Sequence, residues 1–238
     1  MELTILMPCL NESRSIELCI REAARYLASK NIAGEILVAD NGSTDGSREL
    51  AAAAGARVIC VARKGYGNAI LQGIHSAKGR YIILGDSDGS YDFSNLDPIL
   101  DLLRQDCQLV VGNRFSGGIA SGAMPISHQY FGVPFLSWLG RLRFGVEITD
   151  FHCGLRGMCR DAALSAGLQQ GGMEFATEVI GRFADAGFSI AQVDVPLRKD
   201  LRMGPGHLRT IRDGLRHLAL ILFWNRHGCC SGGSGTDG

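Results

Sequence analysis

Two aspartates, Asp86 and Asp88, stand on either side of Ser87 directly after the apolar run at residues 81–84. The run is typical of a buried strand, and a glycine on each side of the Asp-Ser-Asp segment favours a turn there. Carboxylates two residues apart at a strand end can hold one hard divalent cation, which in turn neutralises a diphosphate. The segment therefore predicts a metal site that handles a phosphate-bearing ligand.

Polar residues follow other apolar runs as well. Asn11 and Glu12 come after the run at 3–7, and Asp40 ends the run at 35–40, where it is placed to accept hydrogen bonds from a base or ribose. Lys64, in a turn with two glycines, is a candidate nucleotide contact, although such glycine pairs are common in ordinary turns. Because ligands of parallel sheets bind beyond the carboxyl ends of the strands, we expect these segments to meet at one rim.

The elements that must position these residues alternate between apolar runs and helical patterns. Strands are predicted at 3–7, 35–40, 57–61, 80–84, 108–112 and 189–194. Helices are predicted at 13–29, 45–54, 67–77, 94–104, 128–145 and 174–186. This alternation predicts an α/β fold, a Rossmann-like, mostly parallel sheet flanked by helices, in one domain over residues 1–210. The Gly- and Ser-rich stretch 116–125 predicts a mobile loop over the site.

Composition narrows the function classes. A chain of 238 residues with 46% hydrophobic and 20% charged residues is globular, and its zero net charge and 7% aromatic content disfavour a nucleic-acid partner. Charge is nevertheless polarised: residues 86–106 hold six Asp and one Arg, whereas 198–227 hold seven Lys or Arg and two Asp. This favours a site for metal and phosphate. Eight dispersed cysteines and no secretory signal predict reduced thiols in a cytoplasmic setting.

The last helical pattern, over residues 206–226, has two interpretations. Its apolar residues recur at helical spacing, and its arginines share another face. The stripe either packs on the sheet or lies in a membrane interface, with arginines near anionic headgroups. The apolar run at 218–224 is far below the roughly 20 residues that span a bilayer. Residues 227–238 are expected to form a flexible tail.

Several motifs in order along residues 4–210 carry a family resemblance. They are Met-Pro-Cys-Leu-Asn-Glu at 7–12, Val-Ala-Asp-Asn-Gly-Ser-Thr-Asp-Gly-Ser at 38–47, Gly-Asp-Ser-Asp at 85–88, Val-Gly-Asn-Arg-Phe at 111–115, the segment 150–156, and Arg202-x-Gly-x-Gly-His-Leu. The sequence resembles glycosyltransferase family 2, with the GT-A fold, and within it the dolichyl- and polyprenyl-phosphate sugar synthases.

The resemblance implies a UDP- or GDP-sugar donor in the crevice. It places Pro8, Asn11, Glu12 and Asp40 in the nucleoside pocket. It also implies that Asp86 and Asp88 hold Mg²⁺ or Mn²⁺ against the diphosphate, with Ser87 between them on the donor side.

The implied acceptor is a polyprenyl phosphate, gripped by Arg114 and Arg202, with His128 and His207 as further acceptor-side candidates. The family's closing motif usually reads Arg-x-Gly-x-Ser-Lys, whereas Gly206 and His207 stand here; a histidine is only partly charged near neutrality. A phosphomonoester is already largely ionised at pH 7, so it needs cations rather than a general base. The arginine-rich C-terminal third suits such an acceptor.

A hydroxyl acceptor on a saccharide or lipid is the nearest competing interpretation, and it requires a base. Asp150 and Glu174 are the candidate bases, each with a structural interpretation as well: a turn or ion pair for Asp150, a helix start for Glu174. A nucleotidyltransferase and a sugar-nucleotide-binding protein without turnover are two further, less favoured functions. The expectation overall is an inverting, metal-dependent glycosyltransferase, cytoplasmic and peripheral at the inner face of a membrane.

Overall fold

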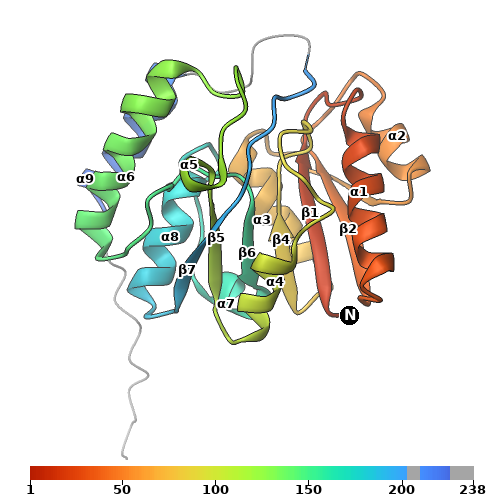
Figure 1. The fold of residues 1–238 in the computed structure, drawn as a ribbon, viewed down its shortest axis with the longest axis horizontal. Coiled ribbons are helices and arrows are strands. Elements are labelled where there is room, and N and C mark those ends of the chain that lie inside the picture. The colour runs from red at the N-terminus through yellow and green to blue at the C-terminus, as the bar shows by residue number, and fades with distance from the viewer. Residues whose placement is uncertain (203–209, 226–238) are drawn as a thin grey trace, which may run out of the picture.

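A computed structural model describes residues 1–202 and 210–225 and contains a seven-stranded sheet in the order β3-β2-β1-β4-β6-β5-β7 (Figure 1). β6 runs antiparallel to β4 and β5, and the other pairings are parallel. The strands are β1 Leu3–Cys9, β2 Gly34–Asp40, β3 Arg57–Cys60, β4 Tyr81–Leu84, β5 Leu109–Asn113, β6 Arg156–Cys159 and β7 Ile190–Asp194.

Helices cover both faces of the sheet. They are α1 Ile16–Ser29, α2 Ser47–Ala53, α3 Tyr66–Ser76, α4 Asp97–Arg104, α5 Arg114–Gly117, the π-helix η1 His128–Gly132, α6 Val133–Phe144, α7 Arg160–Ser165, α8 Phe175–Asp185 and α9 Thr210–Leu222. α3 packs on one face, where Gly73 meets the Leu6 side chain. α4 packs on the other, where Ile99 and Leu103 fill the space above Gly157. This double cover explains why the central strands are continuous apolar runs: all seven residues of β1 are buried.

The predicted mostly parallel α/β fold is confirmed, and every predicted strand is present within one or two residues at each end. Strand β6 and the short helices α5 and α7 were not predicted from the sequence. β6 has only four residues, Arg-Gly-Met-Cys, with neither alternation nor an apolar run to signal a strand. It forms because it fills the gap between β4 and β5 and pairs with both.

Helix α9 is amphipathic, but polar residues lie on its buried side and large apolar residues lie on its exposed side. Its inner positions include the polar residues Asp213 and His217, which are 7% and 4% exposed. Its outer positions carry Ile211, Leu215 and Leu222, which are 79%, 60% and 56% exposed. Packing of the apolar stripe on the sheet, one of the two interpretations of this segment, is therefore wrong for the described part of the helix. Ile221 and the following Trp224 are the buried apolar anchors at its end.

Helices α6 and α9 lie side by side at one end of the molecule, away from the central strands (Figure 1). Over the part of the chain that the structure describes, no helix is both long enough and apolar enough to cross a bilayer.

Candidate functional site

Two cavities open beyond the carboxyl ends of β1 and β4, one of about 360 Å³ and one of about 300 Å³. We name the two cavities after the residues that the sequence analysis placed on each side. The larger is the donor cavity, which is lined by the expected donor-side residues Pro8, Glu12, Lys64 and Ser87. The smaller is the acceptor cavity, which is lined by the expected acceptor-side residues Arg114 and His128. The residues common to both walls are Tyr66, Asp86, Asp88, Met173 and Arg202. The carboxylate pair therefore stands at the junction of the two spaces.

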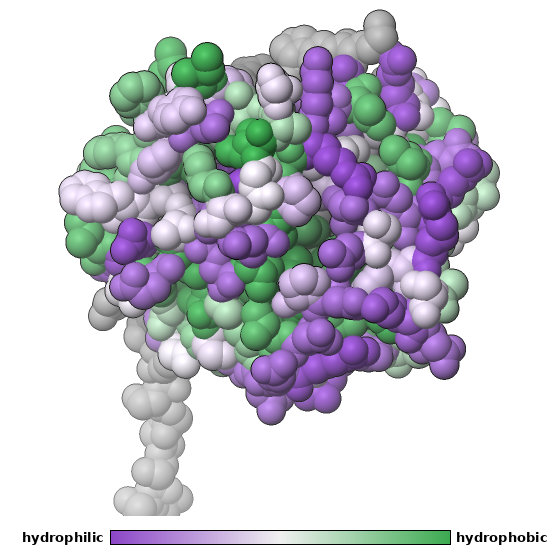
Figure 2. All heavy atoms as spheres, viewed as in Figure 1, coloured by the Kyte–Doolittle hydropathy of each residue, from purple (hydrophilic) through white to green (hydrophobic). Residues whose placement is uncertain are grey.

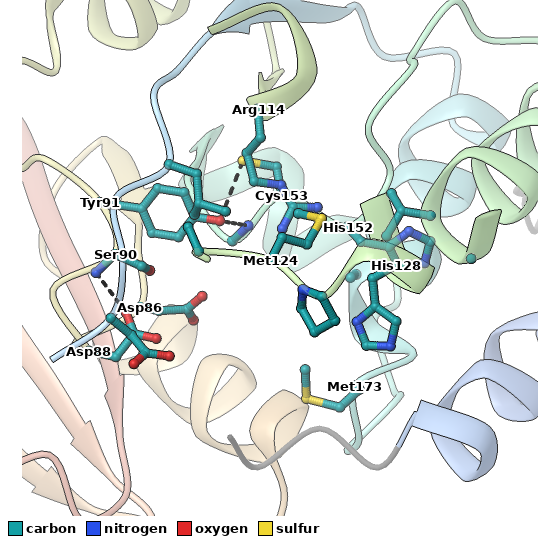
Figure 3. A pocket seen from close by; sticks show the side chains of 18 of the residues that line it. Asp86, Asp88, Ser90, Tyr91, Arg114, Met124, His128, His152, Cys153 and Met173 are labelled. Carbon is teal, nitrogen blue, oxygen red and sulfur yellow. Dashed lines mark hydrogen bonds between the residues drawn. The ribbon is translucent and has the colours of Figure 1, made fainter. Parts of the chain in front are cut away.

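The two carboxylates at this junction, Asp86 and Asp88, accept hydrogen bonds from neighbouring groups of the protein. Asp86 Oδ1 accepts a hydrogen bond from the Tyr66 hydroxyl at 2.9 Å, and Asp88 Oδ1 accepts one from the backbone N–H of Ser90 at 2.9 Å. Burial, and then the nearby charge of Asp88, raise the pKa of Asp86. Figure 3 shows both carboxylates on one side of the acceptor cavity, facing His128 and Met173 across it.

This pair fits a hard divalent cation, because two carboxylates that repel each other in a buried place are stabilised by a shared positive ion. The described residues contain no group of three or more His, Cys, Asp or Glu side chains that could hold a metal. A cation here would therefore take its remaining ligands from a bound diphosphate and water, as Mg²⁺ commonly does.

Glycine at position 154 permits the close approach of Asp86. A Cβ at Gly154 would lie 2.2 Å from Asp86 Oδ2, well inside contact distance. The same backbone donates from its N–H to the Tyr91 hydroxyl at 2.8 Å. The segment 150–156 thus shapes the carboxylate site through its backbone, a role that the sequence analysis did not assign to Gly154.

Two of the residues expected to bind the donor do not line the donor cavity. They accept hydrogen bonds from the loop beside it. Asp40 is 1% exposed and accepts from the N–H groups of Gly42 and Ser43 at 3.0 and 3.2 Å. Asn11 has φ 58° and accepts from the Thr44 N–H at 2.8 Å. Neither is among the described residues that line the donor or the acceptor cavity. These contacts fix the turns after β1 and β2, so the two residues position the rim.

Asn41, which was not predicted, lines the donor cavity and organises its other edge. Its side-chain oxygen accepts from Gly65 N–H at 2.7 Å, and its backbone oxygen accepts from Lys64 Nζ at 2.6 Å. Ser87 joins β4 to β1 by donating to the Pro8 carbonyl at 2.8 Å. The expected grouping of Pro8, Lys64 and Ser87 around one space is present.

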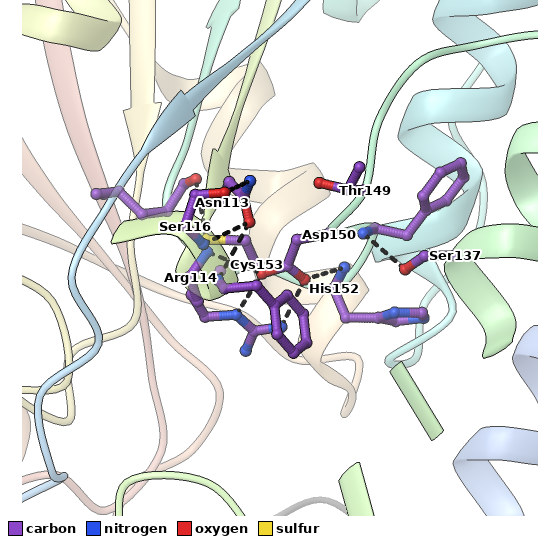
Figure 4. Close-up of polar contacts among 12 residues, drawn as sticks. Asn113, Arg114, Ser116, Ser137, Thr149, Asp150, His152 and Cys153 are labelled. Carbon is purple, nitrogen blue, oxygen red and sulfur yellow. Dashed lines mark hydrogen bonds and ion pairs between the residues drawn. The ribbon is translucent and has the colours of Figure 1, made fainter. Parts of the chain in front are cut away.

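Arg114 and Asp150 form a buried, bidentate ion pair (Figure 4). Arg114 Nε and Nη2 each donate to an Asp150 oxygen at 2.7 Å, and the Asp150 side chain is 0% exposed. The backbone N–H of His152 also donates to this carboxylate, at 3.2 Å. Asp150 is thus engaged on both oxygens and is not among the described lining residues of either cavity. Its geometry is that of a residue that orients Arg114, which lines the acceptor cavity.

Glu174 likewise stands behind the wall. It is 5% exposed at the start of α8, and its Oε1 lies 3.7 Å from Arg216 Nη2. Arg216 lines the donor cavity, so Glu174 acts on that cavity through an arginine. The carboxylate that does line the acceptor cavity beside the junction pair is Asp200, which the sequence analysis did not consider.

A pair of histidines closes the acceptor cavity on the side of α9. His152 Nε2 lies 3.3 Å from His217 Nδ1, which also contacts the Thr177 hydroxyl at 2.7 Å. Burial lowers the pKa of His217 to about 4 and, together with the neighbouring His217, lowers that of His152. Both histidines are therefore neutral at physiological pH. His128 lines the cavity as expected, and His207 lies outside the described residues.

A mostly parallel α/β sheet flanked by helices is the architecture of the GT-A glycosyltransferases. Residues 4–165 match the family described as Glycosyl transferase family 2, and the chain belongs to that family.

Among its relatives, the low-salt glycan biosynthesis hexosyltransferase Agl6 of Haloferax volcanii is 37% identical over 222 residues, which are 92% of this chain and 53% of Agl6. The chain thus spans about half the length of that relative. A dolichyl-phosphate hexose transferase of Haloferax volcanii is 26% identical over 198 residues, with 83% of each chain covered. Glucosyl-3-phosphoglycerate synthase from Mycobacterium tuberculosis, crystallised with Mn²⁺, uridine diphosphate and phosphoglyceric acid, superimposes with a TM-score of 0.74 at 22% identity, covering 95% of this chain and 80% of the synthase.

Proposed function

We propose that this chain transfers a sugar, with inversion, from a nucleotide-diphosphate sugar to a polyprenyl phosphate. The observation that carries the proposal is the placement of Asp86 and Asp88 at the junction of the two cavities, with Arg114 on the acceptor side. A relative named as a dolichyl-phosphate hexose transferase and a structural neighbour that binds uridine diphosphate with Mn²⁺ support the two substrate classes.

On the donor side, Asp86 and Asp88 would hold Mg²⁺ or Mn²⁺, which neutralises the leaving diphosphate when bound. Lys64 and Arg216 line the same cavity and add positive charge where phosphates gather. Pro8 and Glu12 line the part nearest β1, where we place the nucleoside. Asn11 and Asp40 keep this rim in shape through their contacts to the turn at 42–44.

On the acceptor side, Arg114 would grip the acceptor phosphate. Asp150 takes its Nε and Nη2, and Nη1 is the remaining nitrogen of the guanidinium. A phosphate monoester attacks the anomeric carbon as an anion, so it needs this positioning and no proton acceptor. Asp150 and Glu174, the bases that a hydroxyl acceptor was expected to require, both lie behind the cavity walls, which favours the phosphate.

The described surface around the acceptor cavity suits a lipid-borne acceptor. One side of η1 and α6 lines the cavity through His128, Val133 and Leu136, and the other side carries a row of large exposed apolar residues. These are Tyr130, Phe131, Phe135, Trp138 and Leu142, each at least 53% exposed. Figure 2 shows hydrophobic and weakly polar side chains gathered on this side and strongly hydrophilic ones on the side of α1 and α2. With the outer face of α9, they form an apolar platform of the kind that marks a membrane contact.

The helices of the platform carry more basic than acidic residues. α6 carries Arg141 and Arg143 and no acidic residue, and the acidic residue of α9, Asp213, is buried, while Arg212 and Arg216 border the donor cavity. Basic residues beside an apolar face favour an anionic bilayer surface. We therefore place the protein at a membrane surface, with the acceptor cavity opening beside the platform.

Transfer assays with two classes of acceptor test this function. Purified protein with Mn²⁺ is incubated with labelled UDP- and GDP-sugars and either a polyprenyl phosphate or a lipid saccharide bearing only hydroxyls. We expect product with the phosphate, retention of that activity in Asp200→Asn, and its loss by roughly tenfold to a hundredfold in Arg114→Lys, which keeps the charge but not the paired hydrogen bonds.

Activity with the hydroxyl acceptor that disappears in D200N would instead assign Asp200 as a base and identify a hydroxyl-directed transferase. Nucleotide-sugar binding without any turnover would identify a binding protein. Circular dichroism of each variant establishes that a loss of activity is not a loss of fold.

A further inference from the structure

Arg202 holds an unusual place at the junction of the two cavities. Its Nε donates to Glu12 Oε1 at 2.7 Å, and Nη2 contacts the same oxygen. Its Nη1 lies 3.2 Å from Asp88 Oδ2. The side chains of Glu12 and Asp88 are 3% and 9% exposed, so the guanidinium is set between two buried carboxylates. One of these belongs to the donor cavity and the other to the proposed metal site.

The backbone leading to Arg202 is attached to the same turn that carries Asp88. Arg198 N–H donates to the Ser90 carbonyl and Leu201 N–H donates to the Asp88 carbonyl, both at 2.9 Å. Leu201 also packs over Gly89, where a Cβ would lie 3.0 Å from its Cδ1. These backbone hydrogen bonds hold the segment before Arg202 against the turn at residues 88–90. They therefore help to place the Arg202 guanidinium beside Asp88.

Asp88 has two oxygens, and each has a partner. Oδ1 accepts from the Ser90 N–H, a bond within the turn itself, and Oδ2 faces Arg202. A hard divalent cation bound at Asp88 Oδ2 would lie close to the Arg202 guanidinium, and two positive groups beside one carboxylate oxygen repel each other. The oxygen most readily released to a metal is Oδ2, because that requires only a rotation of the Arg202 side chain.

We propose that Arg202 is an internal counter-ion for Asp88 that the metal displaces, and that the displaced guanidinium then turns its Nη1 to a phosphate while it stays attached to Glu12. This inference rests on the proposed function, since it takes a diphosphate as the second partner. In the empty site, Arg202 neutralises the carboxylate pair. In a loaded site, a divalent cation held by Asp86 and Asp88 would supply the neutralising charge, and Arg202 would be released to bind the substrate.

This exchange makes metal and nucleotide binding cooperative. A metal ion that binds alone must break the contact between Arg202 and Asp88 and leaves the guanidinium with one partner fewer. A metal ion that binds with a diphosphate supplies a replacement partner. By linkage, the nucleotide raises the metal affinity by the same factor as the metal raises the nucleotide affinity.

Titration calorimetry with Mn²⁺ alone tests the exchange without any turnover. We expect Arg202→Gln to bind Mn²⁺ about tenfold more tightly than the wild type, as loss of a close, partly buried competing charge implies. Arg198→Gln is the matched control: it lies on the same segment, but its partners Glu22 and Asp92 line neither cavity among the described residues. Its Mn²⁺ affinity should equal that of the wild type.

A second titration, with UDP and then GDP at saturating Mn²⁺, measures the coupling. R202Q should bind the nucleotide more weakly than the wild type and show a smaller ratio between affinities with and without Mn²⁺. Arg202→Lys keeps the positive charge but cannot contact both carboxylates as the guanidinium does. Its nucleotide affinity and coupling ratio should lie between those of the wild type and R202Q, and it serves as a second variant in case R202Q does not fold.

Equal or weaker Mn²⁺ binding by R202Q overturns the inference, as does an undiminished coupling ratio. If the wild type binds neither nucleotide, the proposed donor chemistry fails, and the comparison of Mn²⁺ affinities still decides the role of Arg202.

Discussion

The substitution Asp150→Asn removes the negative charge from the buried Arg114–Asp150 ion pair and keeps a side chain of nearly the same shape. In the wild type, both Asp150 oxygens accept from Arg114 at 2.7 Å, and the Arg114 side chain is 10% exposed. The asparagine variant leaves this guanidinium without a counter-charge in a place where little water reaches it. Breaking a buried pair by removing one partner costs about 3–5 kcal/mol, and we expect the free energy of unfolding to fall by that amount.

Urea unfolding followed by circular dichroism measures the effect, and a double-mutant cycle assigns it to the pair. Arg114→Gln alone should be destabilising for the same reason, whereas R114Q/D150N, which buries no net charge, should lose less than the sum of the two by roughly 2–3 kcal/mol. Asp106→Asn is the control: its ion pair with Arg80 is 3.8 Å long and its side chain is 85% exposed, so a change within about 1 kcal/mol is expected.

Two results would refute the reasoning. A D150N variant about as stable as the wild type would mean that the pair contributes nothing to the fold. Additive single-variant effects would mean that the two residues act independently. If Asp150 were instead a catalytic base, D150N would keep its stability and lose turnover together with one limb of the pH–rate profile.

Three further variants test other parts of the site. Gly154→Ala places a Cβ 2.2 Å from Asp86 Oδ2, so calorimetry should show Mn²⁺ affinity reduced by more than about tenfold in a folded protein; unchanged affinity would remove Asp86 from the metal site. His217 is buried neutral with its pKa lowered from 6.5 to about 4, so its contribution is complete above pH 6.5 and is lost as pH falls toward 4, by up to about 3 kcal/mol. Thermal melts from pH 7.5 to 4.5 should show this loss, with a shallower slope in His217→Asn; equal slopes would contradict it. Leu215→Ser, at a 60% exposed position of α9, should reduce flotation with anionic vesicles, and Leu18→Ser, 41% exposed on α1, should not; equal flotation of the two variants would place the membrane contact elsewhere.

Much of the fold could be predicted from the sequence because its signals are local. β1 and β4 are apolar runs, and Asp86-Ser87-Asp88 follows β4 in a turn that requires glycine at position 89, where φ is 83°. The rule that ligands bind beyond the carboxyl ends of parallel strands then brought separate segments to one rim. Strand β6 carried no such signal, because its pairing partners and not its own residues make it a strand.

The site was only partly predictable, because the role of a charged residue depends on what it faces in three dimensions. Asp150 begins the motif at residues 150–156, yet its carboxylate is taken up by Arg114 and lines neither cavity. Asp200 has no motif of its own and lines the acceptor cavity. Arg202 was expected beside a phosphate, and the structure sets it against Asp88 and Glu12. Burial and partner identity decided each case, and neither can be read from residue type or spacing.

The two cavities beside helix α9 explain its pattern of polar and apolar residues. Its inner side lines both cavities, with Gly214 and His217 at the acceptor cavity and Arg212 at the donor cavity, so these positions must be small or polar. The apolar positions Ile211 and Leu215 are consequently directed outward, although water is a poor environment for them. Contiguous exposed apolar patches of this kind commonly mark a site of contact with another apolar surface. Under the proposed function, the helix that closes the acceptor cavity also carries part of the surface that would meet the membrane holding a lipid-linked acceptor.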